Sequence, residues 1–220
     1  MDTGTLVSLL GEGLLQTLYM TVLGTLMSYV IGLPIGVSLI VTGPNGIKPV
    51  AIYNKVMGFI VNVIRSVPFL ILMIALMPYI RKVIGTGIGT SATTAALVVA
   101  AAPFVARLVE QSLLEVDPGV IEAAQAMGAG NFQIIRKVLL LEARPSLLNG
   151  AAVATINILG YSAMAGIVGG GGLGDLAIRY GLYRFQPSIM WITIIVLVIL
   201  VQILQEAGII LAARMDNRIN

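Results

Sequence analysis

The chain contains no cysteine and no histidine among its 220 residues. It therefore has no disulfide, no Cys or His metal site, no thiol nucleophile and no imidazole general base. Charged residues make up only 10% of the sequence, against about 25% in an ordinary soluble domain. Acidic residues are nearly absent from the apolar runs, with Glu110 and Glu206 near the ends of two of them, so a proton relay through a bilayer has few groups to use. We expect no catalytic residue, no metal and no cofactor bound by this chain.

What the chain does have is long apolar sequence. Hydrophobic residues make up 58% of it, and the mean hydropathy is +0.99. A helix needs about 20 apolar residues to cross a bilayer, and four uncharged runs reach that length. A fifth, shorter run is extended backward across Arg65. This pattern predicts an all-α integral membrane protein, a single transmembrane domain over residues 1–220, with five spanning helices near 14–42, 56–80, 83–107, 145–168 and 186–210.

The basic residues predict the orientation of these spans. With the N-terminus outside and the C-terminus in the cytoplasm, nine of the 13 Lys and Arg residues lie on or toward the cytoplasmic side, as the positive-inside rule favours. The nine are Lys48, Lys55, Arg65, Arg107, Arg136, Lys137, Arg144, Arg214 and Arg218, and the four outside are Arg81, Lys82, Arg179 and Arg184. Topology thus explains the net charge of +3, and we expect no nucleic acid partner.

A polar cytoplasmic loop near 108–144 contains one short amphipathic helix. Asp117 and Pro118 predict its start, because Asp caps free N–H groups and Pro is favoured at the first helical position. Gly128 predicts its end. Between them, apolar residues recur at helical spacing and give one apolar face outside the membrane. That face either docks a partner or lies back on its own bundle or the lipid headgroups.

Small residues and glycines predict where the helices pack or break. Gly24, Ser28, Gly32 and Gly36 recur every four residues, which lets a neighbouring helix approach closely. The run 169–174 matches G-x-G-x-x-G, but it has no preceding strand and no βαβ unit, so we reject a dinucleotide site. No Gly-Lys-Ser or Gly-Lys-Thr motif for ATP is present either. We expect this run to be non-helical backbone lining a vestibule, or a plain flexible loop.

Together these features resemble a known family. Glu122-Ala123-Ala124, followed by Gly128 and then by Val138-Leu139-Leu140, is similar to the EAA loop of type I ABC importer permeases. Leu141 stands where that family has proline, which leaves the end of the second loop helix open. Nearly the whole chain is similar to the methionine importer branch, through segments 65–69, 101–107, 136–140 and 160–166.

The resemblance implies a five-span permease subunit of an ATP-driven methionine importer in the bacterial inner membrane. It implies a homodimer in the lipid bilayer, a cytoplasmic ATPase dimer that binds ATP and Mg, and an external substrate-binding protein or lipoprotein. The residues expected to couple to the ATPase are Val120, Ile121, Glu122, Ala123, Ala124, Met127 and Gly128. Glu122 would anchor the helix, by pairing with a loop arginine such as Arg136 or by contacting the ATPase.

The translocation path is predicted from side-chain chemistry. Thioether and hydroxyl groups in the spans, or at their irregular ends, suit a thioether cargo, although Met is also a common gap-filler in apolar bundles. The candidates are Ser66, Pro68, Met73, Met77, Tyr161, Ser162 and Met164.

Three other functions stay open from the sequence. The first is an ABC importer permease whose cargo is another small amino acid and not D- or L-methionine. A secondary carrier would need its own coupling site, usually in an internal repeat, and we see no repeat between the first two and the last two spans. A small pore or scaffold would use the polar loop as a platform for an unrelated partner.

Overall fold

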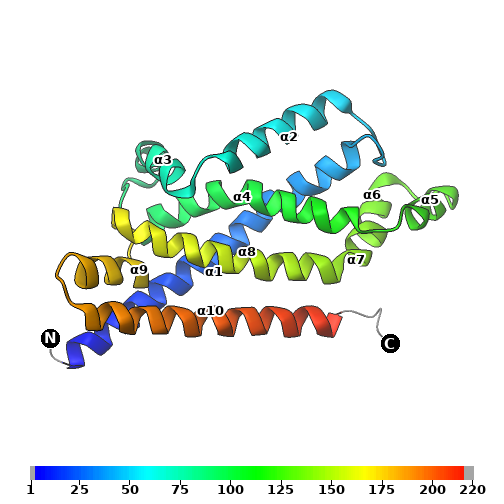
Figure 1. Ribbon diagram of the computed structural model, residues 1–220. Coiled ribbons are helices and arrows are strands. Elements are labelled where there is room, and N and C mark those ends of the chain that lie inside the picture. Colours follow the sequence, from blue (N-terminus) through cyan, green and yellow to red (C-terminus); the bar gives the residue numbers. More distant parts are fainter. Residues whose placement is uncertain (1–2, 216–220) are drawn as a thin grey trace. The chain divides into compact units, whose positions relative to one another are not determined.

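The computed structural model describes residues 3–215, and all their regular structure is helical (Figure 1). Because a bilayer offers no hydrogen-bond partners to an exposed backbone, helices are the expected solution for so apolar a chain. The longer helices are α1 (Thr3–Thr42), α2 (Ala51–Ser66), α3 (Phe69–Ile84), α4 (Thr90–Leu114), α5 (Pro118–Ala126), α8 (Arg144–Met164) and α10 (Pro187–Met215). Shorter elements are α6 (Asn131–Ile134), α7 (Leu140–Glu142) and α9 (Gly172–Leu176), with π-helical turns at Ile135–Leu139 and Ala177–Leu182 and a 3-10 turn at Ala165–Val168.

The described chain divides into two compact units. The first unit takes in the chain up to residue 28 together with 67–101 and 154–205. The second takes in 29–66, 102–153 and the chain from 206 onward. The helices α1, α4, α8 and α10 each contribute one segment to each unit. The second unit contains the whole EAA-like loop, and the first contains the glycine-rich run.

Four helical segments of the described residues are long and apolar enough to cross a membrane, or five if a bent pair counts as one. The four are residues 4–42, 90–114, 144–182 and 187–210. Relative to the expected spans, α1 starts earlier, and α4 is shifted from 83–107 to Thr90–Leu114. The count of exactly five crossings stays a prediction, because it depends on the bent pair α2 and α3.

The expected second span, 56–80, is not one helix. α2 ends at Ser66, α3 begins at Phe69, and the chain bends by 105° at this break. Pro68 is the physical reason: it has no N–H to donate, and its ring pushes Val67 out of the helical region. Pro68 instead takes the position before α3, with φ −56° and ψ 134°, and its carbonyl accepts the N–H of Leu72 at 3.0 Å.

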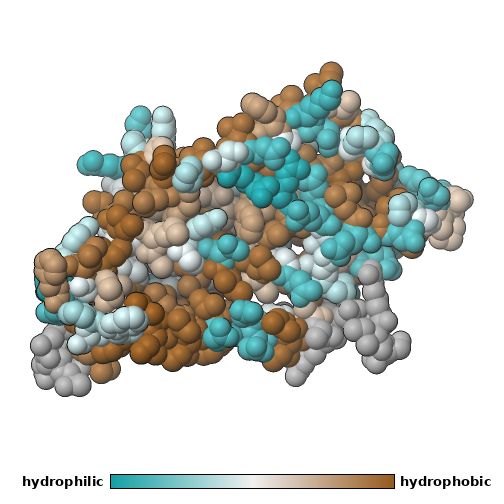
Figure 2. Space-filling view, in the orientation of Figure 1, coloured by the Kyte–Doolittle hydropathy of each residue, from teal (hydrophilic) through white to brown (hydrophobic). Residues whose placement is uncertain are grey.

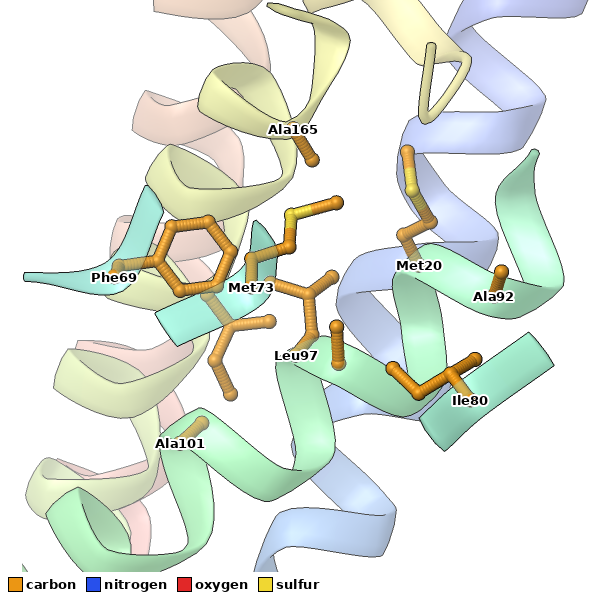
Figure 3. Close-up of a cluster of buried hydrophobic side chains, with 10 residues drawn as sticks. Met20, Phe69, Met73, Ile80, Ala92, Leu97, Ala101 and Ala165 are labelled. Carbon is orange, nitrogen blue, oxygen red and sulfur yellow. The ribbon is translucent and has the colours of Figure 1, made fainter. Parts of the chain in front are cut away.

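The first unit is held by a cluster of fully or nearly buried apolar side chains (Figure 3). Met73 lies near the middle of the labelled side chains, with Phe69 to its left and Ala165 above it in the view of Figure 3. The ring of Phe69 stacks on Tyr161 with centroids 4.5 Å apart, which connects α3 to α8. Small alanines from α4 complete the cluster and leave room for the larger side chains.

In the second unit, α1 and α4 approach so closely that only glycine fits between them. A Cβ added at Gly32 would lie 2.8 Å from the carbonyl oxygen of Ala102, and one at Gly36 would lie 2.6 Å from that of Ala106. Real Cβ atoms do not approach other atoms this closely. The small-residue stripe predicted from the sequence is therefore confirmed as a helix-packing surface along this part of α1.

Candidate functional site

Helix α5 has the two ends that the sequence predicted. The Asp117 carboxylate accepts the N–H of Gly119 at 2.7 Å, and Pro118 occupies the first helical turn. At the other end, Gly128 takes φ +79°. The N–H of Gly128 reaches the carbonyl of Gln125 at 2.9 Å, and that of Ala129 reaches Ala124 at 3.1 Å. This pair of bonds is a Schellman motif, which stops a helix by using a left-handed glycine.

The helix presents one face to solvent and turns the other inward. Ala124 is buried, with 5% of its surface exposed, and Ile121 is half-buried. On the outer side, Glu122 and Ala123 are exposed, while Val120 is 41% and Met127 82% exposed. Of the predicted coupling residues, Ala124 and Ile121 thus anchor α5 to its own chain. The remaining residues of that set are exposed, and Glu122 also lines a smaller pocket beside Ile121.

The inward side of α5 covers a small cavity within the second unit. This cavity measures about 330 Å³ and lies between α5 and the turn that follows α1. Ile40, Gly46, Ile121 and Leu139 are among its lining residues. Because Ile121 lines this cavity and Ala124 is buried, one side of α5 faces its own chain, while Ala123 and Met127 are exposed.

Glu122 has no ion-pair partner among the described residues, and no bond joins it to Arg136. Both side chains are exposed. The expectation that Glu122 pairs with Arg136 within the chain therefore finds no contact to support it. The other expectation, that Glu122 contacts the ATPase, stays a prediction.

The segment after α5 is mostly helical up to residue 142. α6 lies beside α5 and leads through the π-helical turn into α7, which ends at Glu142 (Figure 1). Residue 141 is leucine and not proline, so it can continue a helix, and α7 extends to Glu142. The single turn residue Ala143 separates α7 from α8, which begins at Arg144. Hydrophilic side chains gather over this segment, although Phe132 is an exposed apolar residue within it (Figure 2).

The predicted path residues fall into three environments. Met73 and Ser162 are buried inside the first unit, and the Ser162 hydroxyl donates to the carbonyl of Leu159 at 2.7 Å. Tyr161 and Met77 are partly buried and pack against the cluster that contains Met73. Three candidates are exposed: Ser66, Pro68 and Met164. The structure brings Met73, Met77 and Tyr161 together, while Ser66 belongs to the second unit.

The glycine-rich run is tightly packed rather than an open loop. The Gln16 carbonyl oxygen accepts the N–H of Gly172 at 2.7 Å, and the Thr17 hydroxyl accepts that of Leu173 at 2.9 Å. A Cβ at Gly174 would lie 2.1 Å from the carbonyl oxygen of Ala163. The sequence carries no local signal for the roles of Gln16 and Thr17, because these residues lie 156 positions from the N–H groups that they bind.

A second arrangement that the sequence did not reveal surrounds Arg107. Its guanidinium forms an ion pair with Glu110 and donates to the Asn62 side chain at 2.9 Å and to the Gly58 carbonyl at 3.2 Å. These bonds connect α4 to α2 within the second unit. A charge inside an apolar helix is tolerated where it is paired in this way.

Comparison with known proteins gives a consistent set of similarities. Residues 32–219 match the family described as the binding-protein-dependent transport system inner membrane component. The chain is 49% identical to the probable D-methionine transport system permease protein MetI of Vibrio cholerae, over 92% of this chain and 90% of that one. It is also 49% identical to the D-methionine transport system permease protein MetI of Escherichia coli K12, over 72% of this chain and 73% of that one.

Solved structures give the same result. The chain superimposes with a TM-score of 0.96 on a chain of the MetNI methionine ABC transporter, crystallised in inward-facing conformations. Sequence identity is 44%, and the match covers 99% of this chain and 100% of the other. An amino acid ABC transporter crystallised with histidines shares the fold, with a TM-score of 0.72 and 22% identity.

Proposed function

The chain belongs to the family of binding-protein-dependent transport system inner membrane components, and on that premise we propose that it is the membrane-spanning permease subunit of an ATP-driven methionine importer. Such a subunit forms the pathway and is not itself the ATPase. Nearly full-length similarity to D-methionine permeases supports methionine as the cargo. The observation that carries the coupling role is helix α5, which is capped at both ends, anchored through Ala124 and free on its outer face.

We propose that the permease works as a homodimer bound to a cytoplasmic ATPase dimer. ATP and Mg belong to that ATPase, and an external binding protein or lipoprotein supplies the amino acid. A single chain of four or five spans encloses only half of a pathway, which favours two copies in the lipid bilayer. The MetNI transporter, to which this chain is structurally similar, supports the association with an ATPase.

The outer face of α5 is proposed to sit in a cleft of the ATPase and to follow its closure. A rigid lever transmits such a movement because packed interfaces are bistable and do not deform continuously. Ile121 and Ala124 connect the lever to the permease, and Val120, Ala123 and Met127 supply its contact surface. Glu122 is proposed to meet a polar group of the ATPase, since it has no partner among residues 3–215.

The distribution of basic residues supports an orientation with the N-terminus outside. All four basic residues expected outside, Arg81, Lys82, Arg179 and Arg184, belong to the first unit. Every one expected inside between Lys48 and Arg144 belongs to the second unit, as does α5. Arg218 lies outside the described residues.

Co-purification tests the coupling role. Wild type is expected to retain the ATPase after gentle solubilisation, and an Ala123→Asp, Met127→Asp variant is expected to lose it. Both side chains are exposed, so the variant should fold. Asn131→Asp adds a negative charge in the same loop but outside α5 and serves as the matched control. ATPase retained equally by all three proteins would refute docking through this face.

Transport in proteoliposomes tests the cargo and the energy source. The reconstituted complex with its binding protein should take up labelled methionine only when ATP is supplied, with no effect of a protonophore. D-methionine, L-methionine and other small amino acids, each added as a competitor, identify the preferred cargo. Uptake that collapses with a protonophore at constant ATP would instead establish a secondary carrier.

We also expect Gly128→Asp to leave the dimer in the membrane but to separate ATP hydrolysis from uptake.

A further inference from the structure

A cavity of about 890 Å³ opens beside α3, inside the first unit. Its lining comes from α3, the turn that follows it and Val168. Pockets that hold small molecules measure roughly 300–1,000 Å³ and are mostly apolar with a few polar groups, so this cavity has the size and character of a ligand site. Of the residues predicted for the path, Met77 is the one that lines it.

Helix α3 supplies the apolar wall of the cavity and the two cations at its end. Ile74, Met77 and Pro78 lie three and four residues apart and form one apolar stripe. The next residue on that stripe is Arg81, in the last turn of α3, with Lys82 beside it. From Ile74 to Arg81 the helix rises roughly 10 Å, at about 1.5 Å per residue. The stripe therefore runs from apolar to cationic over the length of a small extended molecule.

The two cations are available to a ligand. Arg81 and Lys82 are exposed, and neither forms an ion pair with another described residue. The cavity lining contains no acidic residue. In the same unit, the carboxylate of Asp175 is already paired with Arg179. A guanidinium in such a setting binds a carboxylate with two parallel hydrogen bonds.

The last turn of α3 also suits a positive group. Helices end with carbonyl groups that lack partners inside the helix and carry the negative end of its dipole. Here α3 ends at Gly85 in a left-handed conformation, φ +88°, whose N–H takes up only the carbonyl of Arg81. An anion-binding pair and a carbonyl-rich helix end thus stand next to each other, as a zwitterion requires.

We propose that this cavity is a receiving site for a free α-amino acid with an unbranched apolar side chain. The α-carboxylate pairs with Arg81 and Lys82, the α-ammonium lies at the end of α3, and the side chain lies along Ile74, Met77 and Pro78. Methionine has this shape, so the site deepens the proposed function and rests on it. The outer position follows from the proposed orientation. Figure 2 shows hydrophilic side chains in the region of α3.

The apolar stripe beside the two cations favours a small amino acid over a protein surface. An acidic patch on a binding protein would need only exposed cations, and it would leave the apolar stripe empty. A small linear ligand uses both the cations and the stripe. We therefore commit to the amino acid and treat the protein surface as an outcome of the test.

The test measures equilibrium binding of labelled L-methionine to the purified permease–ATPase complex without the binding protein. We expect saturable binding, and Arg81→Gln, Lys82→Gln should weaken it about tenfold, the loss of one or two charge-assisted hydrogen bonds. Norleucine should compete and methionine methyl ester should not, because only the ester lacks the carboxylate. Arg184→Gln is the control: it removes an exposed outer cation that stacks on Tyr180 and does not line the cavity.

Three outcomes would overturn the proposal. The double variant binds methionine as tightly as wild type, or the ester competes as well as methionine, or wild-type binding is not saturable. If the variant instead keeps methionine binding and loses affinity for the binding protein, the cations receive an acidic protein surface. Failure of the proposed function itself is separate: the wild-type complex would then show no ATP-driven methionine uptake.

Discussion

Two glycine-dependent regions of this protein use the same conformation for different reasons. Gly128 takes a positive φ, and so do Gly169, Gly171 and Gly172 in the glycine-rich run. Around Gly128 an added Cβ would meet nothing within 4 Å, whereas at Gly171 and Gly172 it would approach side-chain atoms to 2.7 Å. The end of α5 therefore needs glycine for its backbone angle alone. The glycine-rich run needs it for both angle and space.

This difference fits the proposed roles of the two regions. The α5 helix has an open surface that a partner can cover, and its turn needs only to end the helix. The glycine-rich run is enclosed by α1 and α8 and fixed by Gln16 and Thr17. Side chains of α1 accept the N–H groups of Gly172 and Leu173, and partners of this kind allow irregular backbone inside a membrane protein. The two regions thus differ as a proposed docking element with an exposed surface and an internal segment with close packing.

The strongest test of the rigid region is Gly174→Ala. Gly174 has no positive φ, so the substitution isolates space: the new Cβ would lie 2.1 Å from the Ala163 carbonyl oxygen. We expect a loss of about 3 kcal/mol or more of stability, measured as a lower Tm of the detergent-solubilised protein. Gly160→Ala is the matched control, because nothing lies within 4 Å of that position and the helix there should gain stability. Equal Tm values for both variants would disprove the close packing.

Thr17→Val tests the bond that holds the run. Valine has the shape of threonine but leaves the N–H of Leu173 without its acceptor, which costs about 1–3 kcal/mol for a buried group. The measurement is again Tm, together with protease sensitivity of the run. Thr17→Ser keeps the hydroxyl and should stay close to wild type. A serine variant as unstable as the valine variant would show that packing of the methyl group, and not the hydrogen bond, matters.

Gly128→Ala is the counterpart in the open region. With no steric conflict, the expected cost is only the left-handed backbone of an L-residue, about 1 kcal/mol. Faster hydrogen exchange at the N–H groups of Gly128 and Ala129, which close the Schellman motif, would report it. Gly128→Asn should cost less, because asparagine tolerates this conformation better. A destabilisation as large as that of Gly174→Ala would contradict the distinction between the two regions.

The sequence predicted the elements that local chemistry determines. Asp117, Pro118 and Gly128 define α5 within a dozen residues, and capping rules apply at that range. The α2–α3 break was missed, although Pro68 is a local signal, because the apolar run continues on both sides of it. The contact of Gln16 with Gly172 joins distant residues and has no local signal. Burial of Met73 in the core likewise depends on α4 and α8, so side-chain chemistry alone could not separate it from Met77, which lines a cavity.

The smallest expected effect belongs to the other end of α5. Asp117→Ala removes the acceptor for the N–H of Gly119, and lost N-caps cost about 1 kcal/mol. Because Gly119 is exposed, water replaces part of the lost bond, so global Tm should barely move. We expect faster exchange of the Gly119 amide and a modest fall in ATP-driven uptake, with binding of the ATPase retained. Asp117→Asn keeps a capping oxygen and should restore both, whereas equal losses in the two variants would mean that the charge of Asp117, and not its cap, acts on the partner. Either result sharpens the comparison, since among residues 3–215 no side chain from a distant part of the chain hydrogen-bonds to α5 as Gln16 and Thr17 do to the glycine-rich run.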